Sequence, residues 1–469
     1  MICLCQFIQF LLHKQNEVLP FMASQPIISV SGLRAIVGGS LTQELIEQYI
    51  AAYALQLEQR SPVGPVLLSR DGRESGEMIC QWVANTLMKY GRDILYANIL
   101  ATPTVGVEIL EHQAAGAVQV TASHNPPQYN GLKLYGADGR IINAVQGAQL
   151  LEDYQLKRSP KPKTTLGSHS ILTNTNQRHL EKLLALVDVE SIQNEQFKVL
   201  LDCNHGAGSK LAIPLLEALG CQITVLGAEP NGQFAHPAEP TAENLESVGK
   251  QVVTHQCDLG FCQDPDADRL ALIDAEGQYV GEEYTVALCV QQLLAEEPGD
   301  VVINCATSRM AYDLAAAAGT RCLESAVGEA NVVDLMLSSG ATFGGEGNGG
   351  PIDPRVGLIR DSFVGMVRIL ALLTREQRSL KELAAEIPTY AIHKTKISLE
   401  GTDAEGVFSD LIEKFPEAEA DHTDGLKLRW PNGDWLLVRA SNTEPIIRAI
   451  AETRTLQDSQ ELCEKALGR

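Results

Sequence analysis

Short apolar runs rich in β-branched residues alternate with helical patterns through most of this chain. In the first block, a strand-like run at residues 66–69 is followed by a helical pattern at 78–90 and by a second run at 94–99. A run, a helix and a run in this order predict βαβ units, whose strands pair in a mostly parallel sheet. The chain is therefore predicted to adopt an α/β fold.

The same alternation returns twice before the pattern changes near the C-terminus. Strand-like runs at residues 198–202 and 222–226 flank a helical pattern, and a run at 301–304 belongs to a third block. After Pro388 the chain alternates between strands and terminal helices, which is typical of a smaller α+β domain. At roughly 100–200 residues per domain, a chain of 469 residues holds about three or four domains.

These patterns divide the chain into an extension and four domains. Residues 1–23 are predicted to be an N-terminal extension, possibly a mis-called start, because residues 22–28 read like the beginning of a protein. The predicted α/β domains cover residues 24–156, 168–275 and 276–380, and the α+β domain covers 388–469.

The charge of the chain excludes some partners. Lys and Arg number 37 against 59 Asp and Glu, and a net charge of -22 repels a nucleic-acid backbone, so we expect no nucleic-acid partner. An anionic substrate would then need a pocket that is locally basic. The 11 cysteines show no C-x-x-C spacing, which is typical of thiols in a reducing cytosol.

The hydropathy pattern predicts no membrane partner. The apolar stretch at residues 2–12 is too short to span a bilayer, and it lacks the basic start and cleavage site of a signal peptide. We therefore expect a cytoplasmic protein that is a monomer or a homodimer.

A serine follows the strand-like residues 117–120 in the segment 121–133. Ligands of α/β sheets lie at the carboxyl ends of the strands, so Ser123 is a candidate nucleophile, although an isolated segment of this kind is more often a turn. His124 is also a catalytic candidate. However, neighbours in an extended chain point to opposite sides, which makes this adjacent pair a poor nucleophile and base.

Three carboxylates follow the apolar residues 259–262. Asp264, Asp266 and Asp268 have the spacing i, i+2 and i+4, with which an extended turn can direct them at one hard cation. The alternative is a solvated acidic turn, but the apolar flanks argue against full exposure. This segment therefore favours metal binding.

Two further segments could bind polar ligands. Five glycines surround Glu346 and Asn348 at residues 344–350, where the backbone can approach a ligand and the side chains can hold hydroxyls. Two guanidinium groups and two hydroxyls at residues 439–448 form a plausible phosphate cradle. A flexible turn and a charged surface strand are the respective alternatives.

In this order the four segments resemble the α-D-phosphohexomutase family. The matching motifs are T-A-S-H-N-P at 121–126, D-P-D-A-D-R at 264–269, G-E-G-N-G-G at 345–350 and R-A-S-N-T-E-P at 439–445, supported by residues 31–38 and 70–75. The resemblance implies three related α/β domains with mixed sheets and a smaller C-terminal α+β domain. Together they would form a four-domain cleft to which each domain contributes one loop.

The resemblance also implies roles for single residues. Ser123 would carry the phosphoryl group as phosphoserine, and Mg²⁺ would be held by a phosphoserine oxygen and by Asp264, Asp266 and Asp268. Arg34 and Lys133 would serve proton transfer or charge stabilisation beside the serine, with Arg269 near the metal loop. Glu346 and Asn348 would hold the sugar hydroxyls. The phosphate that is not reacting would be bound by Arg439, Ser441, Asn442, Thr443 and Arg448.

The implied reaction interconverts hexose 1-phosphate and hexose 6-phosphate through a 1,6-bisphosphate, which also acts as an activator. The sugar loop at residues 345–350 is similar to that of archaeal-type phosphoglucosamine mutases and of some phosphomannomutases, and residues 325–330 offer no basic side chain. Glucosamine phosphate is therefore the leading substrate, with mannose or glucose phosphate as the alternative. Two alternative functions belong to other classes of protein: a metal-dependent phosphatase that uses Ser123, and a non-catalytic phosphosugar-binding protein.

Overall fold

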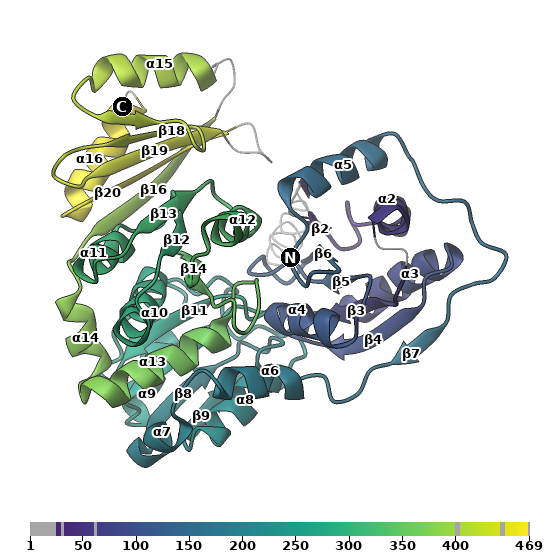
Figure 1. Ribbon diagram of the computed structural model, residues 1–469, viewed down its shortest axis with the longest axis horizontal. Helices are drawn as coiled ribbons and strands as arrows, with labels where there is room; N and C mark the ends of the chain where they lie inside the picture. Colours follow the sequence, from purple (N-terminus) through teal and green to yellow (C-terminus); the bar gives the residue numbers. More distant parts are fainter. Residues whose placement is uncertain (1–24, 30–31, 61–62, 399–403, 441–445, 468–469) are drawn as a thin grey trace, which may run out of the picture.

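The computed structural model describes residues 25–29, 32–60, 63–398, 404–440 and 446–467. The predicted extension, residues 1–23, and the predicted phosphate ligands Ser441, Asn442 and Thr443 lie outside these ranges. Four sheets follow one another along the chain, and Figure 1 shows the first at the right, the second and third at the lower left, and the fourth above the third.

The first unit is built on a seven-stranded mixed sheet in the order β1-β2-β6-β5-β3-β4-β7. Its strands are β1 (Ile27–Ser29), β2 (Gly32–Ile36), β3 (Val66–Arg70), β4 (Ile94–Ile99), β5 (Gly116–Val120), β6 (Tyr129–Gly136) and β7 (His169–Ile171). Its helices are α2 (Gln43–Arg60), α3 (Gly76–Lys89), α4 (Thr102–Glu111) and α5 (Ala144–Gln155). Strands β4, β3 and β5 are parallel, as the βαβ pattern predicts.

Alternation along the strands gives this sheet two apolar faces. Leu68 and Val118 pack in one core with residues of α2, α3 and α5, whereas Leu67 and Ala117 pack on the opposite face with residues of α4. Strand β7 pairs with β4 at the sheet edge. The first sheet thus includes residues that we assigned to the second domain, because the polar linker runs back along the edge before α6 begins.

The second unit has a four-stranded sheet in the order β11-β10-β8-β9. Its strands are β8 (Lys198–Asp202), β9 (Gln222–Leu226), β10 (Leu259–Gln263) and β11 (Leu270–Asp274), and its helices are α6 (Gln177–Leu184), α7 (Val189–Glu195), α8 (Ser209–Ala218) and α9 (Glu246–Thr254). Only β11 is antiparallel to its neighbour among these strands.

The third unit repeats this arrangement in the order β13-β12-β14-β15. Its strands are β12 (Val301–Asn304), β13 (Cys322–Ser325), β14 (Phe343–Glu346) and β15 (Gly350–Ile352). Its helices are α10 (Glu282–Glu296), α11 (Met310–Ala317), α12 (Glu329–Ser339), α13 (Ser362–Glu376) and α14 (Leu380–Glu386). Helices α10 and α13 pack into one continuous apolar core with residues of the second unit, so the two units share a core.

The fourth unit is a five-stranded antiparallel sheet in the order β16-β20-β19-β18-β17. Its elements are β16 (Ala391–Ser398), α15 (Ala404–Lys414), β17 (Glu419–Asp421), β18 (Leu426–Arg429), β19 (Trp435–Ala440), β20 (Ile446–Thr453) and α16 (Leu456–Ala466). It has a small core of its own, which confirms the predicted change to an α+β architecture.

One topological feature places the first three predicted segments. In each of the first three units a central parallel strand is followed by an antiparallel neighbour, in the pairs β5–β6, β10–β11 and β14–β15. The loops of these hairpins therefore lie at the carboxyl ends of parallel strands, where α/β proteins bind ligands. Of the fourth segment, Arg439 lies in β19 and Arg448 in β20, two antiparallel neighbours.

In the described part of the chain, no helix combines the length and apolarity that crossing a membrane requires.

Candidate active site

Ser123 lies at the start of the loop that joins β5 to β6. Its Oγ lies 2.9 Å from Oδ2 of Asp264 and 3.3 Å from Nδ1 of His124. The expectation that the adjacent serine and histidine point apart is wrong, because Ser123 is not extended but has a left-handed φ of 49°. The serine that the sequence singles out is therefore brought to the predicted metal loop, 141 residues further along the chain.

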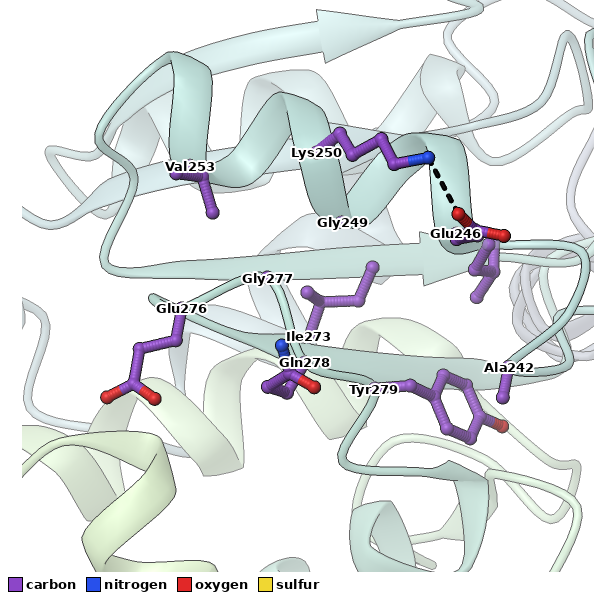
Figure 2. A pocket seen from close by; sticks show the side chains of 11 residues that line it. Ala242, Glu246, Gly249, Lys250, Val253, Ile273, Glu276, Gly277, Gln278 and Tyr279 are labelled. Atoms are coloured by element: carbon purple, nitrogen blue, oxygen red, sulfur yellow. Dashed lines mark hydrogen bonds and ion pairs between the residues drawn. The ribbon is translucent and has the colours of Figure 1, made fainter.

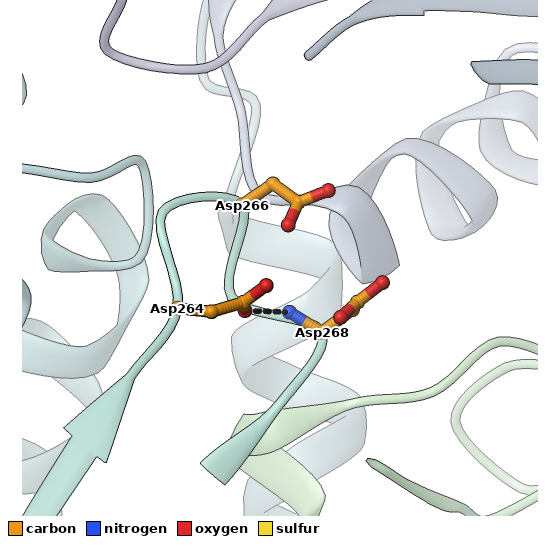
Figure 3. Close-up of side chains that lie close together, drawn as sticks. All are labelled: Asp264, Asp266 and Asp268. Atoms are coloured by element: carbon orange, nitrogen blue, oxygen red, sulfur yellow. Dashed lines mark hydrogen bonds between the residues drawn. The ribbon is translucent and has the colours of Figure 1, made fainter. Parts of the chain in front are cut away.

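The three aspartates come together in the loop between β10 and β11 (Figure 3). Asp264, Asp266 and Asp268 are fully buried, and one carboxylate oxygen from each lies within 4.8 Å of the others. Asp264 Oδ1 accepts hydrogen bonds from the backbone N–H groups of Asp268 and Arg269, which shapes the turn.

This donor set fits a hard divalent cation. Asp266 Oδ1 and Asp268 Oδ1 are buried and find no hydrogen-bond partner among the described residues. Buried carboxylate oxygens normally have partners, and Mg²⁺ takes oxygen ligands of this kind. The loop therefore could hold a Mg²⁺ ion.

Buried cations compensate the negative charge of this loop. Lys133 Nζ lies 2.7 Å from both Asp266 Oδ2 and Asp268 Oδ2, and Arg360 Nη2 lies 2.7 Å from Asp268 Oδ2. Burial opposes ionisation of Asp266 and Asp268, but these cations outweigh it and lower the pKa of both carboxyls. Burial and the two neighbouring carboxylates raise the pKa of Asp264 well above its usual value.

Arg360 and Glu329 are two residues of the site that the sequence reasoning missed. Arg360 bonds to Glu329 Oε2 at 3.1 Å and to Glu346 Oε2 at 3.0 Å, in addition to Asp268. Arg360 lies outside every motif, just before Asp361, the N-cap of α13, and no local spacing marks it. Glu329 is the first residue of α12 and lies in segment 325–330, which stands out in the sequence only because it offers no basic side chain. Burial raises the pKa of Glu329 to about 7.

A cavity of about 420 Å³ is lined by residues from all four units, among them Lys133, Glu329 and Arg360. Ser123, His124 and the three aspartates do not line it; Lys133 and Arg360 connect the cavity to the aspartate loop. The predicted site residues that line it are Arg34, Lys133, Arg269, Glu346, Asn348, Arg439 and Arg448. Five of these seven are basic, so the cavity is locally cationic although the chain carries a net charge of -22. An anionic substrate is attracted to such a site.

The fourth unit presents two guanidinium groups side by side. Arg439 in β19 and Arg448 in β20 are directly paired across the antiparallel ladder, and both line the cavity. Like charges directly opposite each other destabilise a sheet unless an anion lies between them. Asp424 contacts Arg439 at 3.1 Å and reduces this repulsion in part.

A second hollow, of about 320 Å³, lies at the other end of the β10–β11 hairpin (Figure 2). It contains none of the predicted site residues, and its Lys250 is ion-paired with Glu246 at 2.6 Å. It therefore does not compete with the four-unit cavity as the active site.

Fold and site together define a four-domain α/β protein that carries a buried carboxylate loop next to a cationic cavity. A crystal structure of a phosphoglucomutase/phosphomannomutase family protein from Burkholderia thailandensis has this fold, with a TM-score of 0.82, 23% identity, and coverage of 94% of this chain and 97% of that one.

The family models for phosphoglucomutase/phosphomannomutase match along the chain in order. They describe α/β/α domains I, II and III at residues 26–159, 177–277 and 282–390, and the C-terminal domain at 401–468. A "Phosphoglucomutase/phosphomannomutase" of Thermococcus kodakarensis is 32% identical over 92% of this chain and 96% of its own length. A "Probable phosphoglucosamine mutase" of Methanopyrus kandleri is 30% identical over 92% of this chain and 95% of its own length. The chain belongs to the phosphoglucomutase/phosphomannomutase family and is a phosphohexomutase, as the motifs predicted.

Proposed function

We propose that the enzyme interconverts hexose 1-phosphate and hexose 6-phosphate through phosphoserine at Ser123 and a hexose 1,6-bisphosphate. The observation that carries this proposal is the position of Ser123 Oγ, 2.9 Å from Asp264 in a fully buried loop of three aspartates. A nucleophile beside a cation site, with basic side chains nearby, is the arrangement that phosphoryl transfer requires.

Mg²⁺ would be held by Asp264, Asp266, Asp268 and an oxygen of phosphoserine. When bound, it would neutralise charge on the transferring phosphoryl group. Lys133 would act on the same charge, because Asp266 and Asp268 outweigh the effect of burial and raise its pKa, so the ammonium keeps its proton. Arg34 and Arg269 would add positive charge from the cavity wall.

His124 is suited to move the serine proton. Burial and the nearby Arg269 and Arg34 lower its pKa well below the usual value, so the imidazole is neutral at pH 7. When a phosphoryl group returns from the bisphosphate to Ser123, the Oγ–P bond forms and the bond from phosphorus to the sugar oxygen breaks. Nδ1 of His124, 3.3 Å from Oγ, would accept the serine proton. The sugar oxygen that leaves phosphorus would take up a proton and become a hydroxyl, which balances the proton lost by Ser123.

The remaining residues would bind the two ends of the sugar phosphate. The paired Arg439 and Arg448 would hold the phosphate that is not reacting, together with Ser441, Asn442 and Thr443. Glu346 and Asn348 would hold sugar hydroxyls; Glu346 is oriented by hydrogen bonds from Asn304 at 2.6 Å and from the Gly328 N–H at 3.1 Å. In both orientations of the bisphosphate, the phosphate that is not reacting has to be bound at the same place. One cavity would therefore serve both phosphoryl transfers.

We propose glucosamine phosphate as the preferred substrate, with mannose or glucose phosphate as the alternative. The sugar loop supports this choice, as do the names of several relatives about 30% identical. The carboxylates of Glu329 and Glu346 would also suit the ammonium group of an amino sugar. We further propose that the enzyme is cytoplasmic and acts as a monomer or a homodimer. Light scattering on the purified protein would test the oligomeric state.

The test is a ³¹P NMR panel with Mg²⁺ and a trace of the matching 1,6-bisphosphate. Glucosamine, mannose, glucose and N-acetylglucosamine phosphates are offered in turn, and we expect interconversion of the 1- and 6-phosphates, fastest for glucosamine. Ser123→Ala should abolish it. Release of inorganic phosphate would instead indicate a phosphatase, and binding without turnover would indicate a binding protein.

A further inference from the structure

A buried ion pair behind the Ser123 loop has no part in the chemistry proposed above. Asp71 and Arg73 follow β3, next to β5, and their side chains are 0% and 2% exposed. Arg73 donates to Asp71 Oδ2 from Nε at 3.1 Å and to Asp71 Oδ1 from its backbone N–H at 2.9 Å. The two terminal nitrogens of the guanidinium, Nη1 and Nη2, therefore remain available for other partners.

Both terminal nitrogens of Arg73 bind the serine loop. Nη2 donates to the carbonyl oxygens of Ser123 at 2.6 Å and Asn125 at 2.7 Å. Nη1 donates to those of Pro126 at 2.9 Å and Tyr129 at 3.1 Å. One buried guanidinium thus holds four carbonyl groups within seven residues, which a lysine ammonium with three donors cannot reproduce.

Asp71 reaches the other side of Ser123 through a threonine. Thr121 Oγ1 donates to Asp71 Oδ2 at 2.7 Å, and the same oxygen accepts the Ser123 N–H at 2.9 Å. The N–H and the carbonyl of Ser123 are therefore both tied to the Asp71–Arg73 pair. A serine at φ 49° is in a sparsely populated region, and such a conformation persists only where its surroundings impose it.

We propose that Asp71 and Arg73 are positioning residues that hold Ser123 in its left-handed conformation and so direct Oγ at the aspartate loop. The inference rests on the proposed role of Ser123 as the phosphoryl carrier. When the pair is broken, the serine relaxes towards negative φ, and Oγ leaves its position 2.9 Å from Asp264. Substrate binding is unaffected, because the sugar and remote-phosphate residues belong to the third and fourth units.

The first test compares Arg73→Lys with Arg70→Lys. Arg70 lies in the same segment but donates to the Asp71 carbonyl at 3.4 Å, not to the serine loop. We expect R73K to lower kcat about 100-fold with KM changed less than about threefold, as for a nucleophile displaced by about 1 Å. R70K should keep kcat within about threefold of the wild type.

The second test replaces Thr121 and stays informative if R73K fails to fold. Thr121→Val keeps the shape but removes the hydroxyl between Asp71 and the Ser123 N–H, whereas Thr121→Ser keeps the hydroxyl and removes the methyl. T121V should lower kcat about tenfold at constant KM, and T121S should restore it. A role in packing alone would make T121S the more damaging change.

A third variant separates the hydrogen bonds of Arg73 to the serine loop from the packing between the first two units. The Arg73 guanidinium carbon lies over the Phe234 ring, 4.9 Å from its centroid, and Phe234→Leu removes this cation–π contact while leaving every hydrogen-bonding group of Arg73 in place. Wild-type enzyme is first shown by intact mass to accept a phosphoryl group at Ser123 from a 1,6-bisphosphate. With that step present, unchanged kcat in folded R73K and T121V, or an equal loss in F234L, overturns the inference. Absence of that step in the wild type contradicts the proposed function instead.

Discussion

At the scale of single residues, Arg360 shows how one buried cation joins the metal loop to the sugar loop. It is 8% exposed and contacts Asp268, Glu329 and Glu346 through separate nitrogens. Three carboxylates around one buried guanidinium need the planar, five-donor geometry of arginine. Removing a partner from such a network leaves an uncompensated buried charge.

We predict that Arg360→Lys lowers kcat/KM at least about tenfold and destabilises the protein by roughly 2–4 kcal/mol, since an ammonium cannot bridge all three carboxylates. The matched control is Arg355→Lys, because Arg355 pairs with Asp353 at 2.7 Å but is 41% exposed. That substitution should cost less than about 1 kcal/mol. If the two substitutions had equal effects on urea unfolding and on steady-state kinetics, a special role for Arg360 would be contradicted.

At the scale of elements, helix α13 is anchored by its N-cap. Asp361 Oδ1 accepts hydrogen bonds from the N–H groups of Phe363 and Val364, and Oδ2 lies 2.8 Å from Nε2 of the buried His179. His179 also contacts Thr104 Oγ1 in α4 at 3.0 Å. The cap therefore ties the third unit to α6 and to the first unit.

Asp361→Ala should destabilise the protein by roughly 2–4 kcal/mol. The lost cap contributes about 1 kcal/mol, and the unpaired buried histidine contributes about 1–3 kcal/mol. Asp188→Ala removes the N-cap of α7, where the side chain accepts from the Ser191 N–H at an exposed position. Chemical unfolding should show a loss of only about 1 kcal/mol for this control; a matching loss in both variants would mean that His179 gains nothing from Asp361.

Helix α10 carries a carboxyl that predicts a pH dependence of stability. Burial raises the pKa of Glu283 from 4.5 to about 8, and Lys394 Nζ, at 4.0 Å, only partly opposes this. Between these two values the folded state binds the proton and the unfolded state does not, so the contribution of Glu283 to stability falls as pH rises through this window.

Glu283→Gln removes this titration. We expect the melting temperature of the variant, relative to the wild type, to rise between pH 5 and pH 8 and to level off above the pKa of about 8. Melting curves at half-unit pH intervals measure the difference. A difference that is flat or declines with pH would show that Glu283 is ionised in the folded state.

At the scale of the whole molecule, the cavity depends on contacts between the units, which are packed together to different degrees. The second and third units share one core, and the fourth has a separate small core. The fourth unit is joined to the third by Glu324, which pairs with Lys427 at 2.8 Å and also contacts Arg429. The aspartate loop is tied to the rest of the molecule by ion pairs with Lys133 and Arg360 at 2.7 Å.

Removal of Mg²⁺ should therefore abolish activity without unfolding the protein. With excess EDTA we expect loss of mutase turnover, an unchanged far-ultraviolet circular dichroism spectrum, and full recovery on adding Mg²⁺. Ca²⁺ in place of Mg²⁺ is the matched control for the hard-oxygen site, since it prefers more ligands at longer distances. Loss of secondary structure in EDTA would show that the loop needs the ion to fold.

By itself, the sequence determined the features that depend on residues close together along the chain. The βαβ alternation predicted the three α/β units and the change of architecture after Pro388, because strand and helix periodicities are local. The i, i+2, i+4 spacing of Asp264, Asp266 and Asp268 predicted that their carboxylates converge, and the loop places them within 4.8 Å of one another.

Only the tertiary structure decided which distant residues meet. It bent Ser123 into a left-handed turn towards Asp264, added β7 to the first sheet, and brought Arg360 to the carboxylates of two other loops. None of these has a local signal, because each arises from the packing of one unit or strand against another. The sequence therefore carried the chemistry of the site, while the packing of four units decided which charges are buried together and how the serine is aimed.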